Sequence, residues 1–159
     1  MTRATAWSVH LASLLVGVSG LVYGVMRYLL EPPDEFSVVN HPAQPAWQGL
    51  HVLAAPLLVF ACGWIWEGHV WRRVRGGFPR LRTTGLALFL LFFPMTLSGV
   101  LVQVAADEPL HRIAVVVHAA TGALWCLVYP VHFVGGLVQL RRGKTGPAGE
   151  DTAASSRAA

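Results

Sequence analysis

Residues 111–140 read HRIAVVVHAATGALWCLVYPVHFVGGLVQL. A helix needs about 20 apolar residues to cross the hydrocarbon of a bilayer, and this stretch is long enough. It contains His118 and His132, which are fourteen residues apart. At about 1.5 Å per residue the spacing is roughly 21 Å and just under four turns, so both side chains project from nearly the same face. Because an imidazole at membrane depth needs a partner, both histidines are candidate site residues.

The composition is that of a membrane protein. Of the 159 residues, 54% are hydrophobic and only 13% are charged, and the mean hydropathy is +0.52. A soluble domain carries more charge, so we expect an all-α transmembrane four-helix bundle. The net charge of +4 would suggest nucleic acid in a soluble chain, but here the arginines cluster beside apolar segments as topology signals. We therefore expect membrane lipid, and no nucleic acid, as a partner.

Four apolar segments follow one another along the chain. They occupy residues 7–30, 47–71, 83–105 and 111–140, so we expect one four-helix transmembrane domain over residues 1–140. The third segment contains Pro94, which neighbouring helices can tolerate. The tail at 141–159 is small, polar and aperiodic, and we expect it to be disordered in the cytoplasm.

Basic and acidic connections alternate between these segments. The loop at 31–46 and the link at 106–110 are acidic, whereas residues 72–82 contain five arginines and no acid. Arg3 precedes the first segment, and further basic residues follow the last one at 141, 142 and 144. By the positive-inside rule both termini lie in the cytoplasm, so we predict an N-in, C-in topology.

This orientation sorts the histidines into two pairs. His10 and His132 lie toward the cytoplasmic ends of the first and fourth segments, and His51 and His118 toward the outer ends of the second and fourth. Two imidazoles at one depth can hold a low-spin haem b without an open position for substrate. The alternative is that each histidine is an ordinary hydrogen-bonded or interfacial residue. The cost of unpartnered ionisable groups in lipid favours the pairs.

His69 competes with His10 for the inner pair. It stands eighteen residues after His51, roughly 27 Å along a helix, and overshoots the depth of His132 by about 6 Å. We prefer His10 as the ligand. His69 then lies at the cytoplasmic boundary, either as a solvated residue or as a proton carrier for a quinone.

Glycines, arginines and cysteines in and near the segments allow more than one interpretation. Six glycines either let a flat macrocycle approach the backbone or serve ordinary helix packing: Gly17, Gly20, Gly24, Gly63, Gly99 and Gly122. Four arginines either bind haem propionates or only anchor the topology: Arg27 and Arg112 on the outer side, and Arg80 or Arg82 on the inner side. Cys62 and Cys126 are expected to be small buried side chains, and no C-x-x-C-H motif for covalent haem occurs.

The sequence resembles the bacterial dihaem cytochrome b family. The resemblance rests on four apolar segments, on single histidines early in the first and second segments, and on the H-x13-H motif in the fourth. This family comprises bacterial cytochrome b561 proteins and the cytochrome b subunits of formate dehydrogenases and nickel-iron hydrogenases. The resemblance covers residues 7–140. It implies two non-covalent haem b groups, an inner one held by His10 and His132 and an outer one held by His51 and His118. These are the pairs that the depths of the histidines predict.

The resemblance implies electron transfer between a periplasmic-side redox partner and the quinone pool of the bacterial cytoplasmic membrane. No nucleotide fingerprint or iron–sulfur spacing occurs in the sequence, so we expect a subunit that needs a separate donor, with the loop at 31–46 as the docking surface. One alternative is a self-sufficient quinone reductase that uses a small diffusible reductant such as superoxide. Another is a haem-free subunit whose histidines bind a transition metal or transfer protons.

Overall fold

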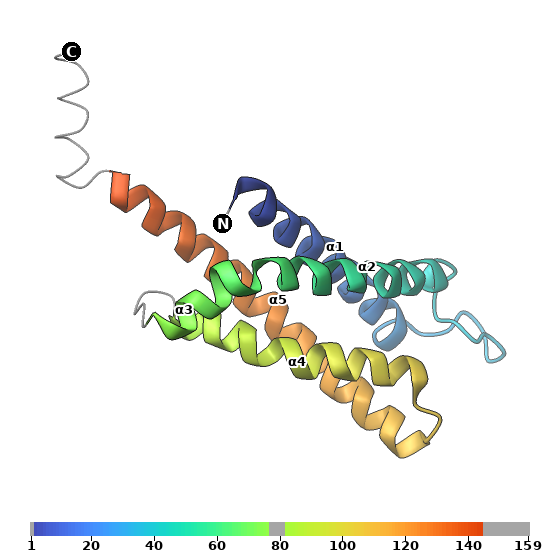
Figure 1. The fold of residues 1–159 in the computed structure, drawn as a ribbon. Helices are drawn as coiled ribbons and strands as arrows, with labels where there is room; N and C mark the ends of the chain where they lie inside the picture. Colours follow the sequence, from blue (N-terminus) through green and yellow to red (C-terminus); the bar gives the residue numbers. More distant parts are fainter. Residues whose placement is uncertain (1, 77–81, 145–159) are drawn as a thin grey trace, which may run out of the picture. The chain divides into compact units, whose positions relative to one another are not determined.

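The computed structural model describes residues 2–76 and 82–144, and the fold there is all-α. In chain order the elements in Figure 1 are α1 (Arg3–Tyr28), α2 (Gln44–Ile65), the π-helical η1 (Trp66–Trp71), α3 (Arg72–Arg75), α4 (Arg82–Val104) and α5 (Glu108–Lys144). Four stretches are long and apolar enough to cross a membrane: Arg3–Tyr28, Gln44–Arg75, Thr83–Val104 and Glu108–Gln139. The predicted all-α class with four membrane-length helices is confirmed.

The chain divides into two compact units, each built around a helical hairpin. In the first unit, within Met1–Gly76, α1 packs along α2, and residues 29–43 connect them. In the second unit, within Gly77–Ala159, α4 packs along α5 after a short turn. Each hairpin brings a first helix against a second helix that carries a candidate histidine.

Polar capping residues set the helix starts outside the apolar segments. The Thr2 side chain accepts a hydrogen bond from the Thr5 backbone N–H at 3.2 Å, so α1 begins before the first apolar residue. The Asp107 carboxylate accepts from the Leu110 backbone N–H at 2.9 Å, and α5 begins at Glu108. At its other end α5 runs on through residues 141–144, which we expected in the tail. The rest of that tail lies outside the described residues.

The second spanning stretch is not α-helical throughout. After α2 the backbone passes through the π-helical η1 before the short α3. Three prolines lie inside long helices: Pro56 in α2, Pro94 in α4 and Pro130 in α5. The expectation that Pro94 would not break its helix is confirmed. A π-helical turn is uncommon and often marks a functional site, so η1 is a local feature to explain.

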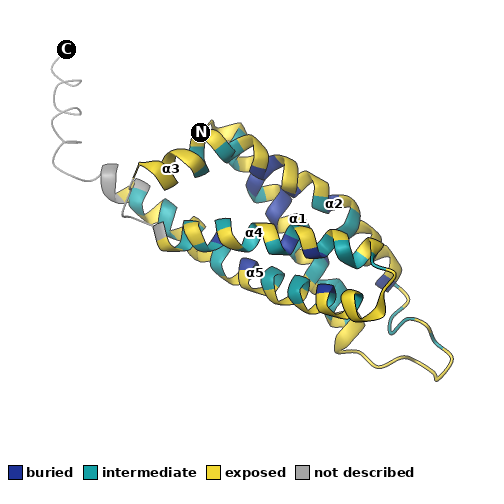
Figure 2. Ribbon diagram, turned by 60° about the horizontal axis from the view of Figure 1, so that its bottom comes forward, coloured by how far each residue is buried: buried dark blue, intermediate teal, exposed yellow. Residues whose placement is uncertain are grey.

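Many of the buried positions in both hairpins carry small side chains. Ala54 and Ala61 in α2 and Ala114 in α5 are 2–3% exposed, and Ser19 in α1 is fully buried. Small residues let helix backbones approach closely, which is how helices pack in a membrane. Large apolar side chains such as Leu53 are exposed instead, and only 11–22% of each spanning window is buried. Exposed residues, drawn in yellow, run along all the long helices in Figure 2. Such helices are suited to lipid, because water would penalise so much apolar surface.

Candidate functional site

His51 of α2 reaches across to the backbone of α1. Its Nδ1 atom lies 3.0 Å from the carbonyl oxygen of Val16 and 3.3 Å from the hydroxyl oxygen of Ser19. A carbonyl oxygen can only accept a hydrogen bond, so Nδ1 carries the hydrogen and donates it. A neutral imidazole protonated on Nδ1 has its lone pair on Nε2, which is the atom that can bind a metal. The contact therefore sets both the orientation and the tautomer of His51.

Gly20 makes room for this imidazole. A Cβ atom added at Gly20 would lie 2.7 Å from Cε1 and 3.0 Å from Nδ1 of His51, which is closer than real Cβ contacts come. A larger residue at position 20 therefore requires the ring or the helix to shift. The absence of a side chain, rather than backbone flexibility, is the reason for glycine here.

His118 of α5 is held against α4 in the same way. Its Nδ1 atom donates to the carbonyl oxygen of Met95 at 2.9 Å. A Cβ atom at Gly99 would lie 2.9 Å from Cε1 of His118 and 3.1 Å from Nδ1. The lone pair of this imidazole is thus also on Nε2.

The two hairpins repeat one arrangement. In each, the residue whose carbonyl accepts the histidine hydrogen is followed three positions later by a serine, and the serine hydroxyl donates a hydrogen bond to that same carbonyl. A glycine comes directly after the serine. The residues are Val16, Ser19 and Gly20 in α1, and Met95, Ser98 and Gly99 in α4. Both serines also donate to the carbonyl four residues earlier. Val16 and Met95 each stand thirteen residues after the first residue of their helix. We call these two sets the Ser-Gly cradles.

His132 is supported by a side chain instead of the backbone. Its Nδ1 atom lies 2.9 Å from the hydroxyl oxygen of Thr84 in α4. A Cβ atom at Gly85 would lie 3.2 Å from Cε1 of His132, so the ring again fits against a glycine. A hydroxyl both donates and accepts, which means that Nδ1 is the donor whenever Nε2 binds a metal.

His10 of α1 is half-buried and lies edge-on to Trp7, with ring centroids 6.0 Å apart. The His51 ring lies against Gly20, ten residues after His10 and roughly 15 Å farther along α1. Helical side chains lean toward the helix N-terminus, so the His10 ring lies farther still from the His51 ring. The ten-residue offset is about 6 Å less than the roughly 21 Å between His118 and His132, and the lean of the His10 side chain reduces this difference.

His69 lies in η1, is half-buried, and has aromatic residues on either side of it and basic residues after it in the sequence. The guanidinium carbon of Arg75 is 4.5 Å from the centroid of the Trp71 ring, a cation–π contact that fixes the end of this stretch. The π-helical backbone places His69 in a segment without regular α-helical register. Sequence periodicity alone did not predict that backbone.

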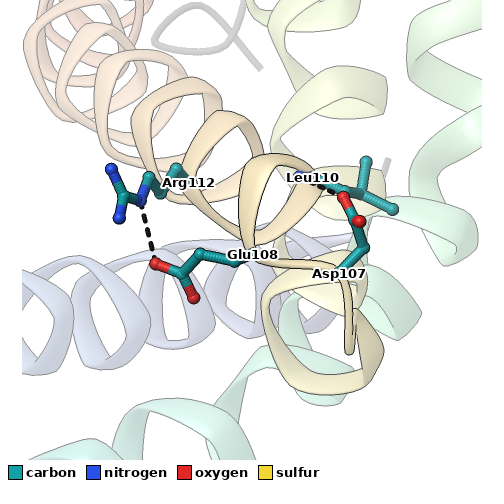
Figure 3. A network of polar contacts seen from close by, with 4 residues as sticks. All are labelled: Asp107, Glu108, Leu110 and Arg112. Atoms are coloured by element: carbon teal, nitrogen blue, oxygen red, sulfur yellow. Dashed lines mark hydrogen bonds and ion pairs between the residues drawn. The ribbon is translucent and has the colours of Figure 1, made fainter.

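The predicted outer arginines have different surroundings. Figure 3 shows Arg112 beside Glu108 on the first turn of α5, with Nε to Oε1 at 2.8 Å and both side chains well exposed. Arg27 is exposed in the last turn of α1. Arg80 and the side chain of Arg82 lie outside the described part of the chain. A role of these arginines toward haem propionates stays a prediction.

Of the predicted ligands, His51, His118 and His132 each contact a neighbouring helix through Nδ1, and Gly20 and Gly99 make room for two of the rings. A Cβ atom at Gly24, Gly63 or Gly122 would meet nothing within 4 Å. Sequence reasoning missed Ser19, Ser98, Thr84 and Gly85. A signal for the first two was present, because the dipeptide Ser-Gly occurs only twice in the sequence, once in each hairpin.

Among residues 2–76 and 82–144, no group of three or more His, Cys, Asp or Glu side chains is placed to hold a metal ion. Three of the described histidines, His51, His118 and His132, each contact a neighbouring helix through Nδ1. A low-spin haem b with two histidine ligands takes one imidazole on each face, so this donor set fits such a group. Comparison of the chain with protein-family models, with curated proteins and with solved structures finds no match.

Proposed function

We propose that this protein is a dihaem cytochrome b that carries electrons across the bacterial cytoplasmic membrane. His51 and His118 bind the outer haem b, and His10 and His132 bind the inner one. The observation that carries the proposal is the pair of Ser-Gly cradles, which give His51 and His118 the Nδ1-protonated tautomer needed for iron binding. An iron held between two imidazoles supplies one-electron redox chemistry and has no open position for substrate.

The residues of the two hairpins hold and orient the ligands. The carbonyls of Val16 and Met95 keep the Nδ1 hydrogens in place, which raises the basicity of Nε2. The glycines beside the rings prevent a steric clash, and the exposed apolar surfaces keep water away in lipid. His10 is preferred to His69 as the inner ligand, because it lies in the regular α-helix α1 toward the proposed cytoplasmic side, whereas His69 lies in the π-helical η1 and overshoots the depth of His132 by about 6 Å.

The proposed topology places both chain termini in the cytoplasm. It rests on the arginines between the second and third spans and on the basic residues after the fourth, which the positive-inside rule assigns to the cytoplasmic side. The loop between α1 and α2 is then periplasmic. In this topology the protein is a multi-pass protein of the inner membrane, and one haem lies near each membrane surface.

The loop between α1 and α2 is a suitable docking surface for an electron donor, because it is held in shape. Asn40 donates through Nδ2 to the carbonyl oxygens of Arg27 at 3.0 Å and Leu30 at 2.7 Å, which ties the loop to the end of α1. At its tip Phe36 and Val38 are 88% and 87% exposed, among three acidic residues, Glu31, Asp34 and Glu35. An exposed apolar tip with an acidic surround fits a soluble redox protein with a basic surface.

Membrane quinone is the proposed acceptor on the cytoplasmic side. His69 lies in η1 within reach of that boundary in the proposed topology, and an imidazole there can deliver a proton to a quinone as it is reduced. The donor docks at the opposite surface, so the chain acts as the electron-transfer subunit of a larger oxidoreductase. Turnover of a small reductant by the purified protein alone would instead indicate a self-sufficient enzyme.

The pairing is tested by counting haems in ligand variants of the purified protein. If His51 and His118 share one haem, then H51A, H118A and the double variant each retain one haem, because the second substitution removes nothing further. H10A and H132A behave likewise toward the other haem. H69A retains two. A double variant H51A/H118A without any haem, or H69A with only one, contradicts the proposed pairs.

A further inference from the structure

Three of the proposed haem ligands make a hydrogen bond through Nδ1, but the partner groups are of two kinds. His51 and His118 donate to backbone carbonyls, whereas His132 contacts the Thr84 hydroxyl at 2.9 Å. The carbonyls belong to helix backbone and cannot be changed by substitution. Thr84 is a side chain, so the sequence can vary this support without altering the fold.

We infer that Thr84 sets the reduction potential of the haem that His132 binds, and that it acts on this haem alone. The inference rests on the proposed function and assigns a positioning and tuning role to a residue that the ligand pairs do not include. Thr84 is half-buried in α4 next to Gly85, which keeps the His132 ring close to the hydroxyl.

The physical basis is the charge that an imidazole can donate to iron. When Thr84 accepts the Nδ1 hydrogen of His132, electron density at Nε2 rises, and this favours the oxidised, more positively charged iron. The potential is therefore lower with the hydrogen bond than without it. One electron is gained or lost at the iron, while the proton stays on Nδ1 of His132, so the couple itself involves no proton transfer.

The expected size of the effect follows from the affinity of the ligand for the two iron states. Loss of a hydrogen bond behind a metal-binding histidine changes metal affinity by about 10-fold to 100-fold. A tenfold change in the ratio of ferric to ferrous affinity corresponds to about 59 mV for a one-electron couple. A shift of this size is well resolved in a potentiometric titration.

The chain offers closely matched variants for the test. Thr84→Val keeps the shape and removes the hydroxyl, and Thr84→Ser keeps the hydroxyl. Thr83→Val makes the same chemical change one residue away, on an exposed position of α4. The full chain, purified in detergent with its haems, is titrated between dithionite and ferricyanide while the visible α-band is recorded.

We expect T84V to raise one of two midpoint potentials and to leave the other unchanged, with T84S and T83V both equal to the wild type. Loss of one haem from T84V but not from T84S supports the same conclusion, since the hydroxyl is then needed to hold His132. Unchanged potentials in T84V, or equal shifts in T84S or T83V, overturn the inference while the proposed function stands. Absence of haem from the wild-type protein overturns both.

Discussion

The imidazole of His118 donates from Nδ1 to the carbonyl oxygen of Met95 at 2.9 Å, and the glycine one turn after Met95 lies against the same ring. His51 has the equivalent relationship to Val16 and Gly20 in the other hairpin. A histidine whose tautomer is set by a backbone carbonyl is prepared to bind metal through Nε2 before the metal arrives. Two such histidines in two separate hairpins make haem ligation the function to test.

Gly99→Ala should weaken or abolish one haem site. The added Cβ atom would lie 2.9 Å from Cε1 of His118, so the ring or the helix must shift, and we expect the hydrogen bond to the Met95 carbonyl to be strained. Gly49→Ala is the control, because Gly49 is exposed on α2 and nothing lies within 4 Å of its Cβ position. We expect haem affinity to fall by at least about tenfold in G99A and to be unchanged in G49A, as measured by haem content after purification. Equal haem content in the two variants would show that the glycine only packs helices.

Gly20→Ala should affect the same haem from the other hairpin. Its Cβ atom would lie 2.7 Å from Cε1 of His51, whereas a Cβ at Gly24, one turn later on α1, meets nothing within 4 Å. Alanine normally favours a helix over glycine by about 0.5–1 kcal/mol, so a loss in G20A cannot come from helix propensity. We expect the G20A/G99A double variant to retain one haem, like each single variant. Loss of both haems would place His51 and His118 at different haems.

Reduction by a donor protein should depend on the charge of the loop at 31–43. Replacing the acidic residue next to the exposed apolar tip, Glu35→Lys, should slow reduction by a basic soluble donor and make the rate less sensitive to salt. Surface charges are screened over about 8 Å at physiological ionic strength, so the wild-type rate should fall steeply as salt is added. Stopped-flow reduction measures both effects. A wild-type rate independent of salt would move the docking surface elsewhere.

The shape of this loop should depend on pH through Asp34. The Ser37 hydroxyl donates to its carboxylate at 2.8 Å and the Phe36 backbone N–H at 2.9 Å, and together they lower the pKa of Asp34 below its usual 3.8. Because the folded pKa is lowered, these bonds stabilise the loop at all pH values above 3.8, and this stability is lost as the pH falls through the lower folded pKa.

Ser37→Ala should therefore raise the pKa of Asp34 toward 3.8, since it removes the larger of the two contributions. Carbon-13 NMR of the side-chain carboxyl in detergent-solubilised protein measures the titration directly. A midpoint that does not move in S37A would mean that the turn at Asp34 does not form in solution.

Much of the fold follows from hydropathy, because four long apolar segments in a chain with few charges are typical of helices that can cross a membrane. Two helices begin before the apolar segments predicted from hydropathy, because their capping residues, Thr2 and Asp107, are polar and lie outside those segments. The π-helical turn at η1 was not predicted, because its residues fit an ordinary apolar helix equally well.

Spacing along the chain indicated which histidines to consider, but not how they are held. His51 and His118 contact helices that are distant in sequence, and the accepting groups are backbone carbonyls, which every residue has. The six glycines were equivalent in the sequence, whereas in the structure Gly20 and Gly99 lie against a histidine ring and the Cβ positions of Gly24, Gly63 and Gly122 meet nothing within 4 Å. Thr84 carries no sequence signal of its own, because its role depends on the register of α4 against α5.

The central claim is that the chain binds two b-type haems between paired histidines. The most direct measurement is a dithionite-reduced minus oxidised visible spectrum of the detergent-purified protein, together with a pyridine haemochrome count per chain. We predict sharp α and β bands of low-spin haem b and two haems per chain. A purified, folded protein with no visible absorbance would contradict the proposed function, and a single haem would show that one of the two pairs is wrong.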